Sequence, residues 1–528
     1  MMKKNYFLKN LQVNPWLESR RGVAGRKGLV IGAYETCTDG EYKLTPEGEK
    51  LNGQIQGKLT ELLKDSGIKF GKAALYHGIC DYYSTVIAGL GLENTGYNET
   101  EVLYENRENI RWAAAQGVLM QQNQDVSCVC MDPMGCPEAA AEGSKLANWS
   151  YQELRDPENR IPHPDIDLLA NCTEGEKEGW FKGCVMADGQ NVARTLEDIP
   201  ANIMTPKFFA EEAIRILCPC GVHVSVRNMK WIEDQRMFAF LNMAKGSCEP
   251  PYFLEINYCG GSETDRPVLL IGKGVTFDSG GICLKTCIPQ ETYTLDMADY
   301  RGAMNGAAVV VGTIKSLARL GIPINVVGLI PLFENMPSGS ALKPGDVVLT
   351  LKGKTIVVED TDNEGRLALA DALAYSEHFQ PCLDVTIGNL APGGKWSLGS
   401  GATPVFSSSQ IVWDEMKKAG SMTGDRVWRF PLWKQYVDRV RMCKHVDMCN
   451  TGKGFPTANS CLAAGFLSEF VPDCDFVHLD TAGTGMKTRG LYAPYLRGGF
   501  MTGRPVRTVV QFLINMACPL DSTTKCSK

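Results

Sequence analysis

Two stretches of the sequence carry charged residues at the ends of apolar segments. The first, GKGVTFDSGGICLK at residues 272–285, follows the apolar segment PVLLIG, places Lys273 at its end and presents Asp278 and Lys285 in a glycine-flanked loop. Side chains that bind ligands in open α/β sheets lie outside the carboxyl ends of the strands. This stretch therefore indicates a binding site at the end of a buried strand.

The second stretch is EDTDNEGRLALADAL, residues 359–373, which follows the apolar segment KTIVVE and leads into a helix. Asp362 and Glu364 are two residues apart, so an extended loop places both carboxylates on one side. Arg366 follows at the start of the helix, where free backbone N–H groups favour an anion. Taken alone, acidic residues in this position are also typical of helix capping and of complementation of the helix dipole.

Together the two stretches indicate a metal site built from oxygen ligands. Three carboxylates and two lysines at neighbouring strand ends suit a pair of divalent cations. A phosphate-binding loop is excluded, because the GKG segment lacks the Ser or Thr that follows Lys in that motif. A zinc site of imidazoles or thiolates is not expected, because the six His are dispersed and the 20 Cys include no CxxC pair.

The composition is that of a soluble globular chain with a large core. The 528 residues are 44% hydrophobic and 22% charged, with a formal net charge of −6. This acidic balance does not favour nucleic acid as a partner, and no apolar stretch reaches the roughly 18 residues of a membrane helix. The dispersed Cys residues indicate reduced thiols inside a cell.

Alternating strand and helix patterns predict an α/β fold with two domains. We expect a smaller N-terminal α/β domain at residues 28–155 and a larger C-terminal catalytic-type α/β domain at residues 191–518, whose central sheet is mixed and largely parallel. The Pro- and Gly-rich segment 156–190 is the expected linker, and residues 519–528 are the expected tail. Predicted strands include 27–34, 73–76, 83–90, 127–131, 223–227, 267–272, 324–330, 354–359, 384–388 and 476–479, and predicted helices include 45–66, 106–121 and 137–154.

The first 27 residues form a basic segment. They contain Lys and Arg residues against a single acid, Glu18. This composition is typical of a mitochondrial transit peptide. The alternative is a short solvated basic arm, because Ser is scarce and Pro15 interrupts a helix.

The two charged stretches closely resemble the two signatures of the leucyl aminopeptidases, which are hexameric di-metal exopeptidases. The resemblance covers nearly the whole chain. KGLVIGAY, ENIRWAAAQGV and MDPMGCPEAAAEG are similar to the N-terminal domain of that family, whereas NVARTLEDIPANIMTP, LIPLFENMPSG, LGSGAT, GDRVWRFPL and HLDTAG are similar to its catalytic domain.

The resemblance implies roles for six residues. Up to two divalent ions, Mn, Zn or Mg, would be held by Lys273, Asp278, Asp362 and Glu364, with Asp278 and Glu364 bridging. Lys285 would polarise the carbonyl of the peptide substrate and stabilise the developing oxyanion. Arg366 would hold a bicarbonate that acts as a proton shuttle. A homo-oligomer, expected to be a hexamer, is also implied.

The chain departs from the family pattern at two places. The family has a fifth ligand, an Asp, in a segment whose counterpart here is RGAMNGAA, and this chain has Ala303 at that position. Asp299 and Asp296 lie upstream and would replace the ligand only if the start of the helix shifted. The family's Thr-Leu-Thr-Gly run is replaced by residues 389–392, NLAP, which lack both hydroxyls and, at Pro392, an N–H.

These departures leave two functional hypotheses. In the first, the family scaffold has an incomplete metal site and weak or no activity, and it serves as a structural, self-assembling protein of the kind found in insect sperm mitochondrial derivatives. In the second, the chain is an active metal-dependent leucyl aminopeptidase that releases N-terminal residues from peptides. Localisation is expected to be mitochondrial, with the cytoplasm as the alternative.

Overall fold

The computed structural model describes residues 22–518 except 39–40, 65, 171, 286–295, 453–457 and 488–492. The described residues form two compact units, and the main division between them falls between Ala187 and Asp188. Residues 100–103 belong with the second unit and residues 493–497 with the first. Most of the basic segment 1–27 and the whole tail 519–528 lie outside the described residues.

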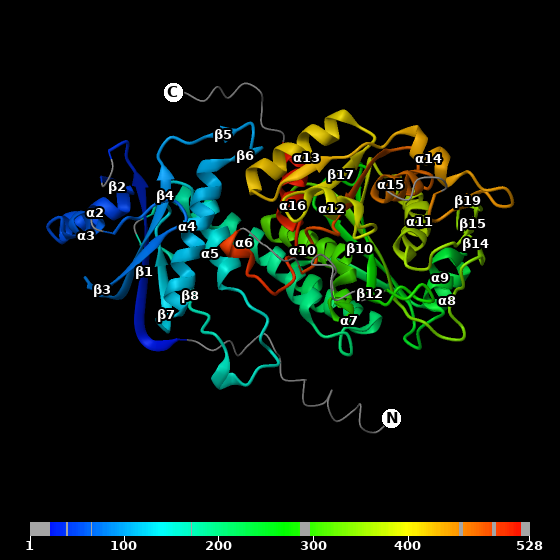
Figure 1. Cartoon of the computed structure of the whole chain (residues 1–528), viewed down its shortest axis with the longest axis horizontal. Coiled ribbons are helices and arrows are strands. Elements are labelled where there is room, and N and C mark those ends of the chain that lie inside the picture. Colours follow the sequence, from blue (N-terminus) through cyan, green and yellow to red (C-terminus); the bar gives the residue numbers. More distant parts are fainter. Residues whose placement is uncertain are drawn as a thin grey trace. The chain divides into compact units, whose positions relative to one another are not determined.

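The first unit is built on a six-stranded sheet in the order β3-β4-β1-β7-β8, with β2 paired to β1 (Figure 1). β1 runs parallel to β4 and β7, and β7 runs parallel to β8, whereas β3 is antiparallel to β4. The strands are β1 (Val23–Glu35), β2 (Tyr42–Leu44), β3 (Ala73–Ile79), β4 (Tyr82–Leu92), β7 (Val126–Met131) and β8 (Asp165–Leu168), and the short pair β5 (Tyr97–Asn98) and β6 (Leu103–Tyr104) stands apart.

Helices cover both faces of this sheet because β1 is apolar on both sides. Val30 packs in a cluster with Ala114 of α4, whereas Leu29 and Ile31 pack in another cluster with Leu59 of α3. A parallel sheet buried on both faces requires such near-continuous apolar strands. The helices of the unit are α2 (Pro46–Gln54), α3 (Lys58–Lys64), α4 (Glu105–Gln122) and α5 (Pro137–Asn148), and α6 (Glu174–Asp198) continues into the second unit.

Two predicted helices differ in extent from the observed ones. The helix predicted over 45–66 is interrupted, because Gln56 and Gly57 adopt positive φ angles between α2 and α3. The helix predicted over 137–154 ends at Asn148, after which Trp149 is extended. The predicted linker 156–190 contains η1 (Pro157–Asn159), β8 and most of α6, and is therefore more regular than its composition indicates.

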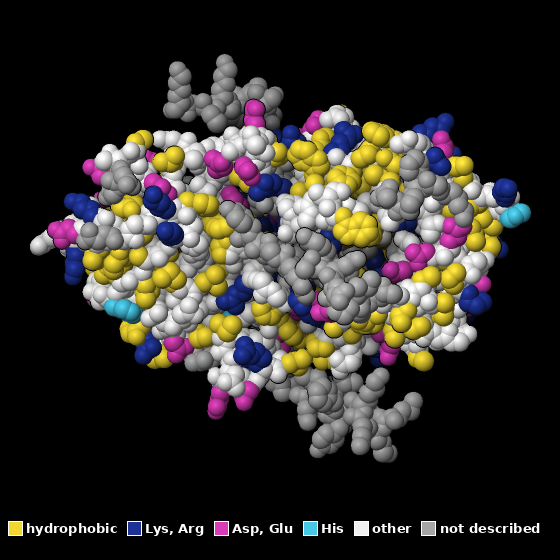
Figure 2. All heavy atoms as spheres, viewed as in Figure 1, with side chains coloured by type: hydrophobic (Ala, Val, Ile, Leu, Met, Phe, Trp, Pro, Cys, Tyr) yellow, Lys and Arg dark blue, Asp and Glu magenta, His cyan; other side chains and the backbone are white. Residues whose placement is uncertain are grey.

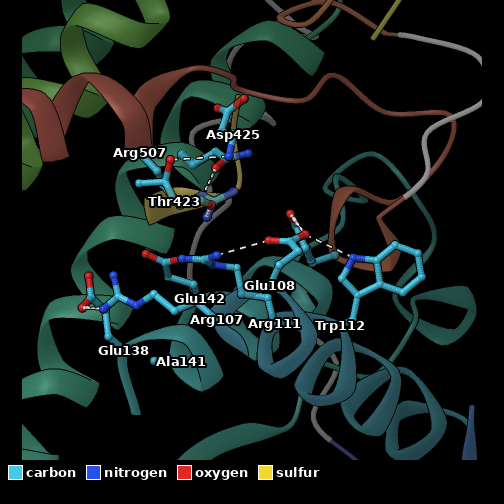
Figure 3. Close-up of polar contacts among 12 residues, drawn as sticks. Arg107, Glu108, Arg111, Trp112, Glu138, Ala141, Glu142, Thr423, Asp425 and Arg507 are labelled. Carbon is cyan, nitrogen blue, oxygen red and sulfur yellow. Dashed lines mark hydrogen bonds and ion pairs between the residues drawn. The ribbon is translucent and has the colours of Figure 1, made fainter. Parts of the chain in front are cut away.

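A cluster of charged residues joins α4, α5 and α6 inside the first unit, and Figure 3 shows its members from α4 and α5. Arg111 Nε donates to Glu142 Oε2 at 2.5 Å, and both side chains are almost fully buried. Arg107 Nη2 lies 2.6 Å from Glu138 Oε2, and the other carboxylate oxygen of Glu138, Oε1, lies 2.9 Å from Lys182 Nζ. We call this group the helix-packing cluster; it consists of Arg107, Glu108, Arg111, Glu138, Glu142 and Lys182.

The second unit contains a nine-stranded mixed sheet in the order β18-β17-β20-β16-β11-β13-β10-β9, with β12 paired to β13. Its centre is parallel, since β11 pairs in parallel with β13 and β16, and β16 with β20. The expected two-unit α/β fold with a mixed, largely parallel sheet is confirmed. The strands are β9 (His223–Arg227), β10 (Tyr252–Cys259), β11 (Val268–Gly272), β12 (Gly274–Asp278), β13 (Asn325–Asn335), β16 (Leu383–Gly388), β17 (Thr403–Ser407), β18 (Val427–Arg429) and β20 (Asp475–Asp480).

Helices lie on both faces of the central strands of this sheet. Leu269 and Ile271 of β11 cluster with Leu367 of α11, whereas Val310 and Ile314 of α10 lie against the opposite face at β13. The helices are α7 (Pro206–Leu217), α8 (Met229–Asp234), α9 (Phe238–Ala244), α10 (Asn305–Leu320), α11 (Glu364–Ser376), α12 (Gly393–Leu398), α13 (Gln410–Thr423), α14 (Lys434–Val440), α15 (Asn459–Ser468) and α16 (Val506–Ala517). A small sheet adds β14 (Val347–Leu349), β15 (Thr355–Val357) and β19 (Met448–Cys449).

The surface mixes charged and apolar side chains. On the face shown in Figure 2, side chains of both charges are interspersed among hydrophobic ones. Within the described ranges, no helix is both long enough and apolar enough to cross a bilayer.

Candidate functional site

The first charged stretch lies at the carboxyl ends of two central strands. Lys273 follows β11 directly, and Asp278 is the last residue of β12. Both side chains are almost completely buried. Two hydrogen bonds fix the backbone of Lys273. Its N donates to Ile387 O of β16, and its O accepts from Ala307 N of α10.

The second charged stretch lies at the start of α11, where Asp362 precedes the helix and Glu364 is its first residue. The carboxylates of Asp278, Asp362 and Glu364 have ligand atoms within 4.8 Å of one another. The sheet therefore brings together three carboxylates that are up to 86 residues apart in sequence. Oxygen ligands clustered at this spacing suit a hard divalent cation.

Both predicted lysines point into the same cluster. Lys273 Nζ lies 2.6 Å from Glu364 Oε1 and donates to the backbone oxygen of Asn389 at 2.9 Å. Lys285 Nζ lies 3.0 Å from Asp278 Oδ2 and also pairs with Asp362. We call these five residues, Lys273, Asp278, Lys285, Asp362 and Glu364, the acidic cluster.

Negative charge exceeds positive charge in the acidic cluster, and the carboxyl pKa values reflect this. Burial, reinforced by Asp278, raises the pKa of Asp362 to about 6 and that of Glu364 to about 7. Although burial opposes it, Lys285 and Lys273 lower the pKa of Asp278, which stays ionised. Despite its burial, the pKa of Lys285 is raised by Asp278 and Asp362. Two ammonium groups facing three carboxylates leave room for a further cation.

The donor set therefore fits a divalent ion. The carboxylates of Asp278, Asp362 and Glu364 offer clustered oxygen atoms, which are the ligands that hard divalent ions prefer. Glu364 Oε1 is paired with Lys273 Nζ at 2.6 Å, so an ion that binds this oxygen competes with the lysine.

Arg366 lies fully buried in the first turn of α11. Its Nη1 donates to Asn450 O at 2.6 Å and its Nη2 to Asn459 O at 3.5 Å. Its Nε has no hydrogen-bond partner among the described residues, and burial lowers the pKa of the guanidinium to about 10. A buried donor without an acceptor fits a small anion such as bicarbonate.

The segment that contains Ala303 is a 3-10 helix, η3 (Met297–Met304). Ala303 is fully buried and belongs to the core cluster that contains Val275 and Leu390. Asp299 is also buried, but its Oδ1 accepts from Lys487 Nζ at 3.1 Å and lies 3.5 Å from Arg301 Nη1. Asp296 is exposed at the cap of η3. Neither aspartate belongs to the group of clustered carboxylates.

Two neighbours of the acidic cluster were not singled out from the sequence. Asn335, the last residue of β13, donates to Asp278 Oδ1 at 2.9 Å. Its position as a polar residue at the end of a strand is the feature of the sequence that could have identified it. The ring of Tyr300 lies with its centroid 4.3 Å from Lys285 Nζ. Only the conformation of η3 reveals this contact, because the loop before it has no periodic pattern.

The loop at residues 389–392 borders the acidic cluster through its backbone. Asn389 O accepts from Lys273 Nζ, and the Asn389 amide contacts Met486 Sδ at 2.8 Å. Pro392 caps α12.

Known proteins match the chain over nearly its whole length. The model of the cytosol aminopeptidase family, catalytic domain, matches residues 191–510, and that of the N-terminal domain of the same family matches residues 30–158. The cytosol aminopeptidase of Sus scrofa is 43% identical over 498 residues, covering 93% of this chain and 93% of that protein. That of Dictyostelium discoideum is 34% identical, covering 97% of this chain and 98% of that protein.

Solved structures agree with these matches. The bottromycin maturation enzyme BotP aligns with a TM-score of 0.77 and 25% identity, covering 93% of this chain and 99% of that one. A structure of BotP in complex with Mn aligns with the same TM-score and 26% identity, covering 94% of this chain and all of that one. The chain belongs to the cytosol aminopeptidase (leucyl aminopeptidase) family, whose members are metalloaminopeptidases.

Proposed function

We propose that this chain is a family scaffold with an incomplete metal site, weak or absent peptidase activity and a structural, self-assembling role. The observation that carries the proposal is Ala303, whose buried methyl group stands where the family pattern has a ligand carboxylate. Asp299, the nearest substitute in sequence, is occupied by its ion pairs with Lys487 and Arg301.

Charge balance supports fewer than two ions. The acidic cluster supplies three carboxylates and two ammonium groups. A lysine that binds a metal must lose its proton, because an ammonium group has no free electron pair. With Lys273 neutral and Lys285 protonated, one divalent ion neutralises the three carboxylates, whereas a second would leave uncompensated positive charge in a buried site, which is costly. A fourth carboxylate at position 303 would offset part of that excess.

Lys273, Asp278, Asp362 and Glu364 would hold the metal, which we propose to be Mn, Zn or Mg. When bound, such an ion supplies Lewis-acid polarisation and lowers the pKa of water. Lys285 would donate a hydrogen bond to the substrate carbonyl, and Arg366 would hold a bicarbonate through its free Nε. In this chain the loop 389–392 lacks the hydroxyls that would orient a peptide, which further reduces the expected activity.

The structural role is proposed with an oligomeric state and a location. We propose a homo-oligomer, in the family's manner a hexamer, in mitochondria and specifically in sperm mitochondrial derivatives, with residues 1–27 as the targeting segment. Support comes from the basic composition of that segment, whereas the names of the relatives favour the cytosol. We also propose that residues 28–155 and 191–518 act as domains joined by residues 156–190.

The alternative is an active aminopeptidase. It is favoured by the presence of Lys273, Asp278, Lys285, Asp362, Glu364 and Arg366, and by relatives named as cytosol aminopeptidases.

The test is hydrolysis of leucine amide by the purified full chain in excess Mn²⁺, with a metal count on the same sample. We expect one ion or none per chain and little turnover. The variant Ala303→Asp should raise metal occupancy, whereas the isosteric control Ala303→Asn should not, because it adds no charge. Two ions and rapid turnover in the unaltered chain would establish the alternative.

A further inference from the structure

We infer that Tyr300 is a positioning residue whose ring holds the ammonium group of Lys285 on the carboxylates of Asp278 and Asp362. The inference rests on the proposed function and deepens it, because it names the side chain that keeps the ammonium group of Lys285 in the site. Lys285 then serves as a resident counter-ion of the acidic cluster.

The conformation of η3 directs Tyr300 toward the cluster. Residues three apart lie on the same face of a 3-10 helix, so Tyr300 shares a face with Ala303. The residues on either side of it, Asp299 and Arg301, are engaged in ion pairs with other elements. The helix face that would carry a ligand carboxylate therefore carries a methyl group and a phenol ring instead.

The contact itself has the geometry of a cation–π interaction. Lys285 Nζ lies 4.3 Å from the ring centroid of Tyr300, inside the range of about 6 Å for such contacts. The same nitrogen lies 3.0 Å from Asp278 Oδ2 and pairs with Asp362. Because only 12% of the Lys285 side chain is exposed, water competes weakly with the ring. Two carboxylates and one aromatic face thus enclose the ammonium group.

This enclosure has a consequence for metal binding. An ion that enters between Asp278 and Asp362 must displace the ammonium group of Lys285. The displaced group would lose its contact with the ring, so Tyr300 lowers the affinity of these carboxylates for a metal. The effect depends on the ring of Tyr300 and not on its phenol hydroxyl, so removing the hydroxyl alone should change the metal affinity little.

The first experiment measures how available Lys285 is in metal-free full-length protein. Limited reductive methylation with formaldehyde and cyanoborohydride, followed by peptide mass spectrometry, would be compared among wild type, Tyr300→Leu and Tyr300→Phe. Methylation of Lys285 should be about 3-fold to 10-fold faster in Tyr300→Leu and within about 2-fold of wild type in Tyr300→Phe. Lys354, whose Nζ lies 5.7 Å from the Phe470 ring centroid, is the internal control. Equal rates in wild type and Tyr300→Leu would overturn the inference.

The second experiment titrates Mn²⁺ alone by calorimetry. Tyr300→Leu should bind Mn²⁺ several-fold more tightly than wild type and Tyr300→Phe; Tyr300→Met replaces Tyr300→Leu if that variant folds poorly. Loss of affinity in both variants would overturn the inference, because it would identify the hydroxyl as a ligand. Two ions per wild-type chain with rapid hydrolysis would refute the proposed function instead, while the methylation contrast still tests Tyr300.

Discussion

Among the described residues, the helix-packing cluster and the acidic cluster differ in how their charges are matched. In the helix-packing cluster three cations face three carboxylates. Arg107 and Arg111 of α4 pair with Glu138 and Glu142 of α5 (Figure 3), whereas the Arg111–Glu108 pair lies within α4. In the acidic cluster two ammonium groups face three carboxylates at strand ends. Burial alone therefore does not distinguish a structural charge cluster from a candidate site.

The carboxyl pKa values differ in part between the two clusters, because in the acidic cluster only Asp278 has a lowered pKa. Although burial opposes it, Arg107 and Lys182 lower the pKa of Glu138, as expected for a carboxylate with enough cations around it. In the acidic cluster burial and neighbouring carboxylates raise the pKa of Asp362 and Glu364. Unmatched negative charge is costly in a protein interior, so its presence points to a ligand that compensates it.

The largest effect is expected from breaking the matched cluster. Arg111→Met would leave the buried Glu142 carboxyl without its closest cation, and breaking a buried ion pair in this way typically costs about 3 to 5 kcal/mol of the free energy of unfolding. Arg107→Met is the matched control in the same helix and should cost less, because Glu138 keeps Lys182. Urea unfolding, with hydrogen exchange localised to α4 and α5, measures both. A loss below about 1 kcal/mol for Arg111→Met would contradict the structural role of the cluster.

A smaller effect is expected at a single buried carboxyl whose hydrogen-bond donor is a hydroxyl. Burial raises the pKa of Asp384, which accepts from Ser376 Oγ at 2.7 Å, to about 7. The folded state therefore binds this proton more tightly than the unfolded state, and the stabilisation is lost as the pH rises through 7. Between pH 5.5 and 8 this group should lower the free energy of unfolding by about 2 kcal/mol.

Asp384→Asn should remove that part of the pH dependence. The measurement is the urea midpoint of wild type and variant at both pH values, and the difference between the two proteins isolates this group from other titrating residues. An unchanged pH slope in the variant would show that Asp384 is ionised over the whole range.

A still smaller effect is expected in the acidic cluster itself. In metal-free protein Glu364→Gln removes one carboxylate from a cluster that has more carboxylates than ammonium groups. The free energy of unfolding should therefore change by less than about 1 kcal/mol or increase. This is the opposite of the result expected for Arg111→Met. Thermal unfolding in the presence of a chelator measures it, and a loss above about 2 kcal/mol would mean that Lys273 depends on Glu364 for its burial.

The smallest effect is expected at an exposed pair of the first unit. Lys43 Nζ lies 2.7 Å from Glu93 Oε1, but both side chains are about half exposed. Lys43→Ala should change the free energy of unfolding by less than about 0.5 kcal/mol, because solvent and salt screen the pair. A larger loss that persists in 0.5 M salt would indicate that Lys43 has a further partner.

Much of the fold follows from local patterns. The segment 267–272 forms β11 because it is a short continuous apolar run, and the segment 106–121 forms α4 (Glu105–Gln122) because its apolar residues recur with a helical period. The sequence of segment 156–190 fits both a linker and regular structure, because its glycines also favour loops. In the structure Gly183 lies in α6, where an added Cβ would come within 2.2 Å of Glu138 O. This glycine permits close helix packing, and sequence alone does not distinguish that use from a linker.

The sequence by itself determined the α/β class, the family resemblance and the six charged residues of the candidate site, because each lies at the end of an apolar segment or in a long motif. It also determined that position 303 is an alanine. Only the tertiary structure decided that Lys273 pairs with Glu364, that Asp299 is held by Lys487, and that Tyr300 lies over Lys285. These contacts join residues far apart in sequence or depend on which face a short helix turns toward the site. Sheet register and helix packing determine both the contacts and the orientation of that helix.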